Sequence, residues 1–369
     1  MQVPFLSFRT VQEALKREMQ LGFERFYDRG WYILGEELKQ FESAYAQFNQ
    51  TNHCVGVSNG LDALTLALKA LGAGPGDEVI VPSNTFIATV LAVSHTGAVP
   101  VFAEPDVDSY NITPATIALH VSKRTRAIIP VHLYGQSCAM NGIMDLAVAE
   151  GLFVVEDNAQ AQGARCKDKL TGSWGHINAT SFYPGKNLGA LGDAGAITTD
   201  DEAYAAQVRL LRNYGSAIKY QHEITGHNMR MDELQAVFLR VKLRYLHEWN
   251  AYRQQVAGWY RELLADAGDL VLPAVHADCS HVYHLFVVRT QSRDALQQFL
   301  QEKGVGTLIH YPVPPHLQQA YRYLGYRKGD FPIAEMLAST CLSLPVYPGI
   351  TAEEVGYVCD CIKLFFGGR

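Results

Sequence analysis

Lys186 lies in a setting that few lysines share. Glycines and a proline surround it in the run Ser181-Phe-Tyr-Pro-Gly-Lys-Asn-Leu-Gly-Ala-Leu-Gly-Asp-Ala-Gly195, which begins in a strand-like segment. Twenty-nine residues earlier, an apolar run ends in Glu156 and Asp157. A loop lysine can form a Schiff base with an aldehyde, and a carboxylate can face a pyridine nitrogen. This pair predicts a covalently held pyridoxal phosphate.

Asp157 would keep the pyridine nitrogen protonated and so make the ring an electron sink. One unit charge at about 4 Å, with an effective dielectric near 20, contributes roughly 4 kcal/mol, or about three pKa units. Alternatively, Asp157 caps the following segment or binds a metal or nucleotide at the carboxyl edge of a sheet.

Two further side chains could complete a ring site. Gln160 follows Asp157 by three residues and could reach the phenolic oxygen of the cofactor, or it is an ordinary polar loop residue. Phe86 follows a strand-like segment through Pro82-Ser-Asn. Its ring could stack on the pyridine from the face opposite Lys186, or it is plain core.

The run Ser58-Asn-Gly-Leu61 follows one strand pattern and opens a helix that continues to Lys69. The first turn of a helix presents unpaired backbone N–H groups and the positive end of the helix dipole, which together favour a phosphate. The hydroxyl of Ser181 is a second candidate phosphate donor. Taken alone, Ser58 could simply cap the helix.

Composition excludes several other classes. The chain has 369 residues, 48% of them apolar and 18% charged, which is typical of a globular protein with more than one core. A net charge of −6 gives no reason to expect nucleic acid or an anionic membrane as a partner. No apolar run is long enough to span a membrane, and residues 1–8 lack a signal-peptide pattern.

Seven scattered cysteines fit a reducing cytoplasm better than a disulfide framework. Cys359 and Cys361 have the spacing of half a metal site, but no second ligand pair has zinc-like spacing, so we expect no metal.

Strand and helix patterns alternate from residue 53 to residue 198. This predicts an α/β fold with a mostly parallel seven-stranded sheet flanked by helices. One of the later strands should be antiparallel. The expected strands are 53–57, 78–81, 99–102, 127–130, 153–156, 179–182 and 195–198.

Helical patterns flank the sheet. Thr10-Val-Gln-Glu13 has the pattern of a capping box that opens a helix toward Phe26, and residues 36–47 are amphipathic. Further helices are expected at 202–214 and, as one long element, at 230–263.

The last third of the chain predicts a compact α+β unit, with strands at 281–289 and 305–310 and helices at 293–303, 333–341 and 352–366. We therefore expect a large cofactor-binding domain over residues 1–247, including the N-terminal helices, and a small C-terminal domain over 248–369.

Taken in order, these motifs resemble the DegT-type family of nucleotide-sugar aminotransferases, which are fold-type I pyridoxal phosphate enzymes. The resemblance covers essentially the whole chain. Asn59, where many relatives have a tighter turn, and Glu104, where many have Asp, depart from the pattern. The matching motifs are Gly30-Trp-Tyr-Ile-Leu-Gly35, Ser58-Asn-Gly60, Pro75-Gly-Asp-Glu-Val79, Glu156-Asp-Asn158, the Lys186 run, Gly226-His-Asn-Met-Arg-Met-Asp232 and Ser343-Leu-Pro345.

The resemblance implies a role for each position. Lys186 would hold the cofactor and move the proton, with Asp157 at the ring nitrogen, Gln160 at the phenolic oxygen and Phe86 on the ring. The phosphate would be bound by Gly60, Leu61 and Ser181, and by Asn228 of a neighbouring subunit in a homodimer. Residues implied in substrate binding are Tyr183, Tyr311, His316 and Arg230, although His316 could be a buried structural histidine, Tyr311 could serve domain packing and Arg230 could be a surface cap or pair.

The glycine-rich lysine run is most similar to the subgroup that aminates C3 of dTDP-linked 3-keto-6-deoxyhexoses. That subgroup implies L-glutamate as the donor, 2-oxoglutarate as its product, and a Fuc3N- or Qui3N-type sugar nucleotide for O-antigen or S-layer glycans. Three alternatives stay open: a non-catalytic pyridoxal phosphate regulator, a doubly wound hydrolase or nucleotide-binding protein, and a family member that aminates C4 or a cyclitol ketone. The hydrolase alternative lacks a Gly-x-Ser-x-Gly elbow and the glycine-rich nucleotide motifs.

Overall fold

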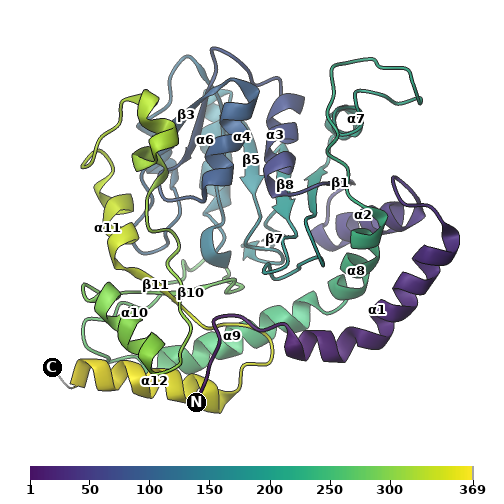
Figure 1. The fold of residues 1–369 in the computed structure, drawn as a ribbon. Helices are drawn as coiled ribbons and strands as arrows, with labels where there is room; N and C mark the ends of the chain where they lie inside the picture. Colours follow the sequence, from purple (N-terminus) through teal and green to yellow (C-terminus); the bar gives the residue numbers. More distant parts are fainter. Residues whose placement is uncertain (368–369) are drawn as a thin grey trace.

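A seven-stranded sheet forms the centre of the protein (Figure 1). The computed structural model describes residues 1–367. The strand order is β1-β9-β8-β5-β4-β2-β3, and β9 alone runs in the direction opposite to the other six strands. The predicted sheet is therefore confirmed, antiparallel member included. Its strands are β1 (His53–Val57), β2 (Glu78–Pro82), β3 (Val99–Ala103), β4 (Thr125–Ile128), β5 (Phe153–Asp157), β8 (Ile177–Ser181) and β9 (Gly195–Thr199).

Helices cover both faces of this sheet, which explains why its strands are apolar without alternation. In β2, Val79 and Val81 pack into one core while Ile80 packs into the other. The first face carries α3 (Gly60–Ala70), α4 (Ile87–Thr96) and α7 (Glu202–Leu211), and the second carries α5 (Pro114–Ala118) and α6 (Met140–Glu150).

Three helices extend this unit beyond the β1 edge: α1 (Arg9–Arg29), α2 (Glu36–Asn49) and α8 (Glu233–Leu243). The predicted capping box at Thr10 is wrong. Helix α1 begins at Arg9 after Phe8 with no side-chain cap, and Glu13 pairs instead with the guanidinium of Arg9 at 2.9 Å.

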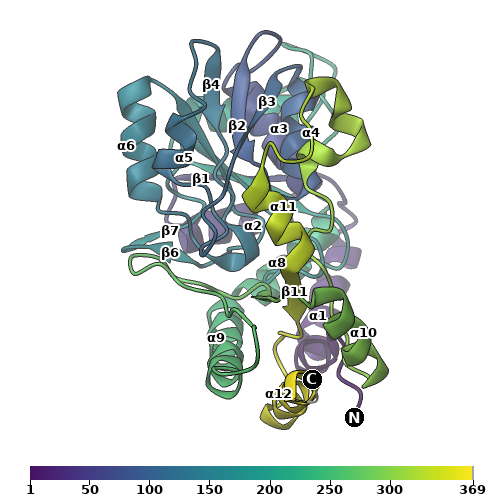
Figure 2. The ribbon, with the colours of Figure 1, turned by 90° about the vertical axis from the view of Figure 1, so that its left-hand side faces the viewer.

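A second core lies below the sheet (Figure 2). It contains α9 (Leu246–Leu263), α10 (Arg293–Glu302), α12 (Ala352–Gly367) and a two-stranded sheet of β10 (Phe286–Arg289) and β11 (Cys341–Leu344). Val3 from the start of the chain is buried in this core, whereas α11 (Pro332–Thr340) packs against the large sheet. The predicted domain boundary between residues 247 and 248 stays a prediction. A segment from each side of that boundary packs in the other core: Val3 in the second core, and α11 against the large sheet.

Three predicted elements differ in the structure. The long helix at 230–263 is two helices, α8 and α9, which meet at Arg244 and Tyr245 because the first packs on the N-terminal helices and most of the second on the second core. The strand at 281–289 is reduced to β10, since Tyr283 has φ of 44°. The segment 305–310 forms only single bridges from Val305 and Leu308.

The remaining regular elements are short. A hairpin of β6 (Arg165–Cys166) and β7 (Lys169–Leu170) and three 3₁₀ turns, at Leu133–Gly135, Pro315–Leu317 and Gln319–Leu324, complete the fold. Within residues 1–367, none of the helices combines the length and apolar character needed to cross a bilayer.

Candidate active site

A cavity of about 910 Å³ lies at the carboxyl ends of the sheet strands and is closed on one side by the second core. Ligands of open α/β sheets bind at this edge. Nine of the predicted site residues line the cavity, although they come from segments far apart in the chain. They are Gly60, Leu61, Phe86, Asp157, Gln160, Ser181, Tyr183, Lys186 and Tyr311.

One end of the cavity is built on the start of α3. Asn59, rather than Ser58, is the N-cap, and its side chain accepts a hydrogen bond from the backbone N–H of Asp62 at 2.9 Å. The alternative in which Ser58 caps the helix is therefore wrong. Within the described residues, the N–H groups of Gly60 and Leu61 make no hydrogen bond. A Cβ on Gly60 would lie 2.6 Å from that of Ser181, so only glycine lets the helix start approach this hydroxyl.

Lys186 is held by a compact turn. Its backbone N–H donates to the carbonyl of Tyr183 at 2.8 Å. The backbone N–H of Ala190 donates to the carbonyl of Phe182 at the same distance and so closes the loop. No protein partner of the Lys186 amine occurs within residues 1–367. Burial lowers the pKa of the Lys186 amine to about 8, against the opposing attraction of Asp157. A large fraction of this amine is therefore neutral and nucleophilic near pH 8.

Asp157 ends β5 and is buried at the wall of the cavity. Its carboxylate accepts hydrogen bonds from the Thr89 hydroxyl at 2.9 Å and the Ala159 N–H at 3.1 Å. Burial raises the pKa of this carboxyl, while those two bonds and the charge of Lys186 act in the opposite direction. The bond to Ala159 means that Asp157 does cap the next turn, and the side chain still lines the cavity.

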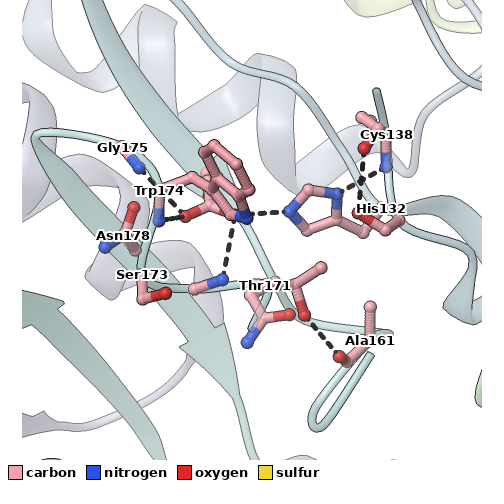
Figure 3. A network of polar contacts seen from close by, with 12 residues as sticks. His132, Cys138, Ala161, Thr171, Ser173, Trp174, Gly175 and Asn178 are labelled. Atoms are coloured by element: carbon pink, nitrogen blue, oxygen red, sulfur yellow. Dashed lines mark hydrogen bonds and ion pairs between the residues drawn. The ribbon is translucent and has the colours of Figure 1, made fainter. Parts of the chain in front are cut away.

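The residue before Asp157 belongs to a buried polar network that the sequence reasoning missed. Figure 3 shows its members His132, Trp174 and Gly175. The adjacent Glu156 carboxylate points to the opposite face, where it accepts backbone N–H groups of Gly172 at 2.9 Å, Trp174 at 2.5 Å and Gly175 at 3.0 Å. His132 Nε2 lies 2.7 Å from the same carboxylate. Both side chains are fully buried. The one signal in the sequence is a second carboxylate directly before Asp157.

The network also fixes the tautomer of His132. His132 Nδ1 accepts the N–H of Cys138 at 3.0 Å, so Nε2 carries the hydrogen and donates it to Glu156. The backbone N–H of His132 donates to the Asp157 carbonyl at 3.2 Å. Glu156 and His132 thus hold the end of β5 from two sides.

The ring-facing side chains form one connected group. The Gln160 carbonyl accepts the N–H of Tyr134 at 2.6 Å, and its amide donates to the Tyr311 hydroxyl at 3.1 Å. The rings of Phe86 and Tyr311 lie 5.2 Å apart between centroids. Phe86 is half exposed to the cavity, which argues against a purely structural role.

Three predicted site residues lie elsewhere. His316 is buried, and its Nε2 lies 3.1 Å from Glu335, so in this structure it is the buried structural histidine of our alternative. Asn228 is exposed and does not line the cavity of its own chain. Arg230 donates to Asn213 at 3.1 Å and lies over the Tyr214 ring.

The second core contributes three more ionisable residues to the cavity: Arg253, His284 and His310. His310 begins the segment 310–316, which we expected to line the substrate pocket, whereas Arg253 and His284 were not predicted. Burial, and then the charge of Lys186, lower the pKa of His310 to about 4 and that of His284 well below its usual value. Both imidazoles are therefore neutral at physiological pH. Arg253 and His284 have no motif in the sequence, because packing of α9 and its neighbours alone brings them to the cavity.

The cavity fits pyridoxal phosphate. It offers unpaired N–H groups and a hydroxyl for a phosphate, a free amine for the aldehyde, a buried carboxylate for the ring nitrogen and an exposed aromatic ring for the pyridine face. In the described part of the chain, no group of side chains could hold a metal ion. Cys359 and Cys361 both lie on α12, packed into the second core.

Comparison with known proteins agrees with this geometry. A sequence model of the DegT/DnrJ/EryC1/StrS aminotransferase family matches residues 13–363. The chain is 49% identical over 363 residues to the erythromycin biosynthesis sensory transduction protein EryC1 of Saccharopolyspora erythraea, covering 98% of this chain and 99% of the relative. It is 48% identical over 363 residues to dTDP-3-amino-3,6-dideoxy-alpha-D-galactopyranose transaminase of Aneurinibacillus thermoaerophilus, with the same coverage. A crystal structure of DesV from S. venezuelae in complex with a ketimine intermediate superimposes with a TM-score of 0.97 at 46% identity, over 99% of this chain and 98% of that one.

Proposed function

Because the chain belongs to the DegT/DnrJ/EryC1/StrS aminotransferase family, it is a pyridoxal-phosphate-dependent sugar aminotransferase of fold-type I, and we propose its two substrates. The amino group would come from L-glutamate. It would go to the C3 ketone of a dTDP-linked 3-keto-6-deoxyhexose, giving a dTDP-3-amino-3,6-dideoxyhexose. The observation that carries the proposal is the free Lys186 amine in one cavity with buried Asp157.

Pyridoxal phosphate, when bound, supplies the aldehyde that carries an amino group from donor to acceptor. Lys186 would hold that aldehyde and then carry the proton, since its pKa near 8 lets it act as base and acid around neutrality. Asp157 would face the ring nitrogen, and Phe86 would cover the ring. Gly60, Leu61 and Ser181 would bind the phosphate through N–H and O–H groups that have no competing acceptor.

The choice of sugar rests on two supports. The relative from A. thermoaerophilus is named for a 3-amino-3,6-dideoxy sugar, and it shares 48% of its residues with this chain. Tyr183 is 60% exposed and lines the same cavity as Tyr311, as expected of residues that a sugar nucleotide covers. We propose a product of Fuc3N or Qui3N type, destined for O-antigen or S-layer glycans and made in the cytoplasm.

A regulatory role without catalysis is the second candidate, because the relative from S. erythraea is named for sensory transduction. A regulator that only binds the cofactor does not need a buried carboxylate that keeps the pyridine nitrogen protonated. Asp157, buried in the same cavity as Lys186, therefore favours catalysis over this candidate.

We propose that the active enzyme is a homodimer in which Asn228 reaches the phosphate in the partner's cavity. Asn228 is exposed beside a loop with large exposed side chains, of which Tyr220 is 83% exposed. A second aromatic group, at Tyr27, Trp31 and Tyr32, is likewise exposed around the end of α1. Exposed aromatic groups of this size are typical of protein interfaces.

The function is tested with purified enzyme, L-glutamate and chemically defined sugar nucleotides. We expect a visible absorbance band from the lysine-bound cofactor, which Lys186→Ala abolishes. Mass spectrometry and NMR should then find an amine at C3 of the dTDP-3-keto sugar. An amine at C4 of a 4-keto sugar would overturn the C3 proposal, and a cofactor-bound protein inactive on both sugars would favour the regulator.

A further inference from the structure

Arg253 carries a positive charge in an unusual position. It lies on α9, is only 3% exposed and lines the same cavity as Lys186. Within residues 1–367, no carboxylate comes within ion-pair distance of its guanidinium, although Asp157 and Asp193 also line the cavity. Buried charges in proteins are normally paired, because an unpaired one loses its hydration without compensation.

The hydrogen bonds of Arg253 leave most of its donors free. Nη1 donates to the carbonyls of Val346 at 2.7 Å, Tyr283 at 3.1 Å and His284 at 3.4 Å. Nε is buried without a partner, and no bond is made by Nη2 to any described residue. One nitrogen therefore fixes the guanidinium against the second core, while Nη2 stays available for a ligand.

The neighbouring groups do not neutralise this charge. His284, another ionisable residue of the wall, is held neutral because burial, and then the charges of Lys186 and Arg253, lower its pKa. The three bonded carbonyls supply only partial negative charge. The second-core side of the cavity thus carries one fixed positive charge. Because this charge is on a planar guanidinium, its geometry suits a carboxylate.

We propose that Arg253 binds the α-carboxylate of the amino-acid donor. The inference rests on the proposed function, since it assigns a binding group to one of the two substrates. In the proposed function the cofactor phosphate has its own site at Gly60 and Ser181, which belong to α3 and β8 of the large sheet rather than to the second core. The α-carboxylate is the group that every amino-acid donor and its keto-acid product share, so a single fixed guanidinium could serve both directions of the donor reaction.

The test separates the donor reaction from the sugar reaction. Each is followed alone, in single turnovers, by the absorbance change of the bound cofactor: the aldehyde form with L-glutamate, and the amino form with the keto sugar. In Arg253→Met we expect binding of L-glutamate and 2-oxoglutarate to weaken by about 30-fold or more, as for loss of a charged partner. The sugar reaction should change by less than about 3-fold.

Two further donors sharpen the result. L-alanine lacks the γ-carboxylate and should show the same fold loss in Arg253→Met, whereas a loss confined to glutamate overturns the α-carboxylate assignment. A primary amine without any carboxylate should react equally with wild type and variant. Arg293→Met is the matched control, because Arg293 is also buried in the second unit and bonds the carbonyls of Ala338 and Cys341 without lining the cavity.

Other outcomes contradict the proposal. An equal loss in both reactions means that Arg253 only maintains the wall, and loss of the cofactor means that its anion is the phosphate. If Arg253→Met does not fold, Arg253→Lys keeps the charge without the planar fork, and the donor reaction alone should weaken by about 10-fold. The donor measurement needs no sugar, so a wrong choice of sugar leaves it interpretable.

Discussion

At the scale of single residues, the Lys186 amine is balanced between two opposing effects. Burial favours its neutral form, and the Asp157 carboxylate favours its charged form. The balance leaves the pKa at about 8, below the value of 10.5 for a free lysine. A protonated amine cannot attack an aldehyde, so loading of the cofactor must depend on pH in the physiological range.

We therefore expect the rate at which the cofactor-free enzyme binds pyridoxal phosphate to rise with pH through about 8 and to level off above it. Stopped-flow absorbance measures this rate directly. In Asp157→Asn the midpoint should move to lower pH, because the charge that holds the amine protonated is gone. A midpoint near 10, or a shift of the variant to higher pH, would contradict this account.

The residues with chemical motifs could be found from sequence, and those placed by packing could not. Lys186 and Asp157 stand at strand ends or in glycine-rich turns, where side chains reach a sheet edge. Arg253 and His284 belong to ordinary helix and loop patterns, and only the docking of the second core brings them to the cavity. His316 was misplaced for the same reason, since the aromatic residues that bury it are remote in the chain.

At the scale of elements, the network of Glu156 fastens β5 to the loop that contains Gly172 and Trp174. In Glu156→Gln an NH₂ group replaces one carboxylate oxygen and meets N–H donors instead of accepting from them. We expect a loss of about 2–4 kcal/mol in the free energy of unfolding. Cofactor retention should weaken as well, because Asp157 is the next residue.

Thermal and chemical unfolding check this prediction, with Glu36→Gln as the control. Among the described residues, the exposed Glu36 side chain bonds only Gln40 on α2, so Glu36→Gln should change the free energy of unfolding by no more than about 0.5 kcal/mol. Equal effects of the two substitutions would mean that the buried network contributes nothing.

A second element contact ties α8 to the lysine loop. Buried Lys242 donates to the Gly189 carbonyl at 2.6 Å, and burial lowers the pKa of its amine to about 8. The unfolded chain therefore binds more protons than the folded one between pH 8 and about 10.5, so this residue's contribution to stability improves as pH rises through that window. The difference in free energy of unfolding between wild type and Lys242→Met should therefore shift in favour of the wild type by at most about 3 kcal/mol as pH rises from 8 to about 10.5. A flat difference between the two proteins would contradict this.

Element prediction from sequence worked where the pattern was long and local. The strands around Val155 and Ile197 were placed to within a residue or two because they are apolar on both faces. The sequence did not predict the break between α8 and α9 at Arg244, because both halves of the pattern are helical on their own. Only their packing against different neighbours requires a bend.

At the scale of the whole molecule, the proposed dimer can be tested by mixing inactive chains. Lys186→Ala removes the cofactor link, and Asn228→Ala removes the proposed contribution to the partner's cavity. In a hybrid of the two, one cavity contains both wild-type residues and the other contains neither. A random mixture should regain about one quarter of wild-type activity, since half of the dimers have one complete site. If Asn228 acts within its own chain, the mixture gains nothing over its components.

The first residues of the chain have a consequence for how the protein is made. Val3 bonds to Gly304 at 2.9 Å and to Gly306 at 2.8 Å, and its side chain is fully buried in the second core. During synthesis this valine leaves the ribosome roughly 300 residues before its partners do. The nascent chain must therefore keep Val3 without its partners while roughly 300 further residues are made, and the second core can close around it only after residues 304–306 have emerged.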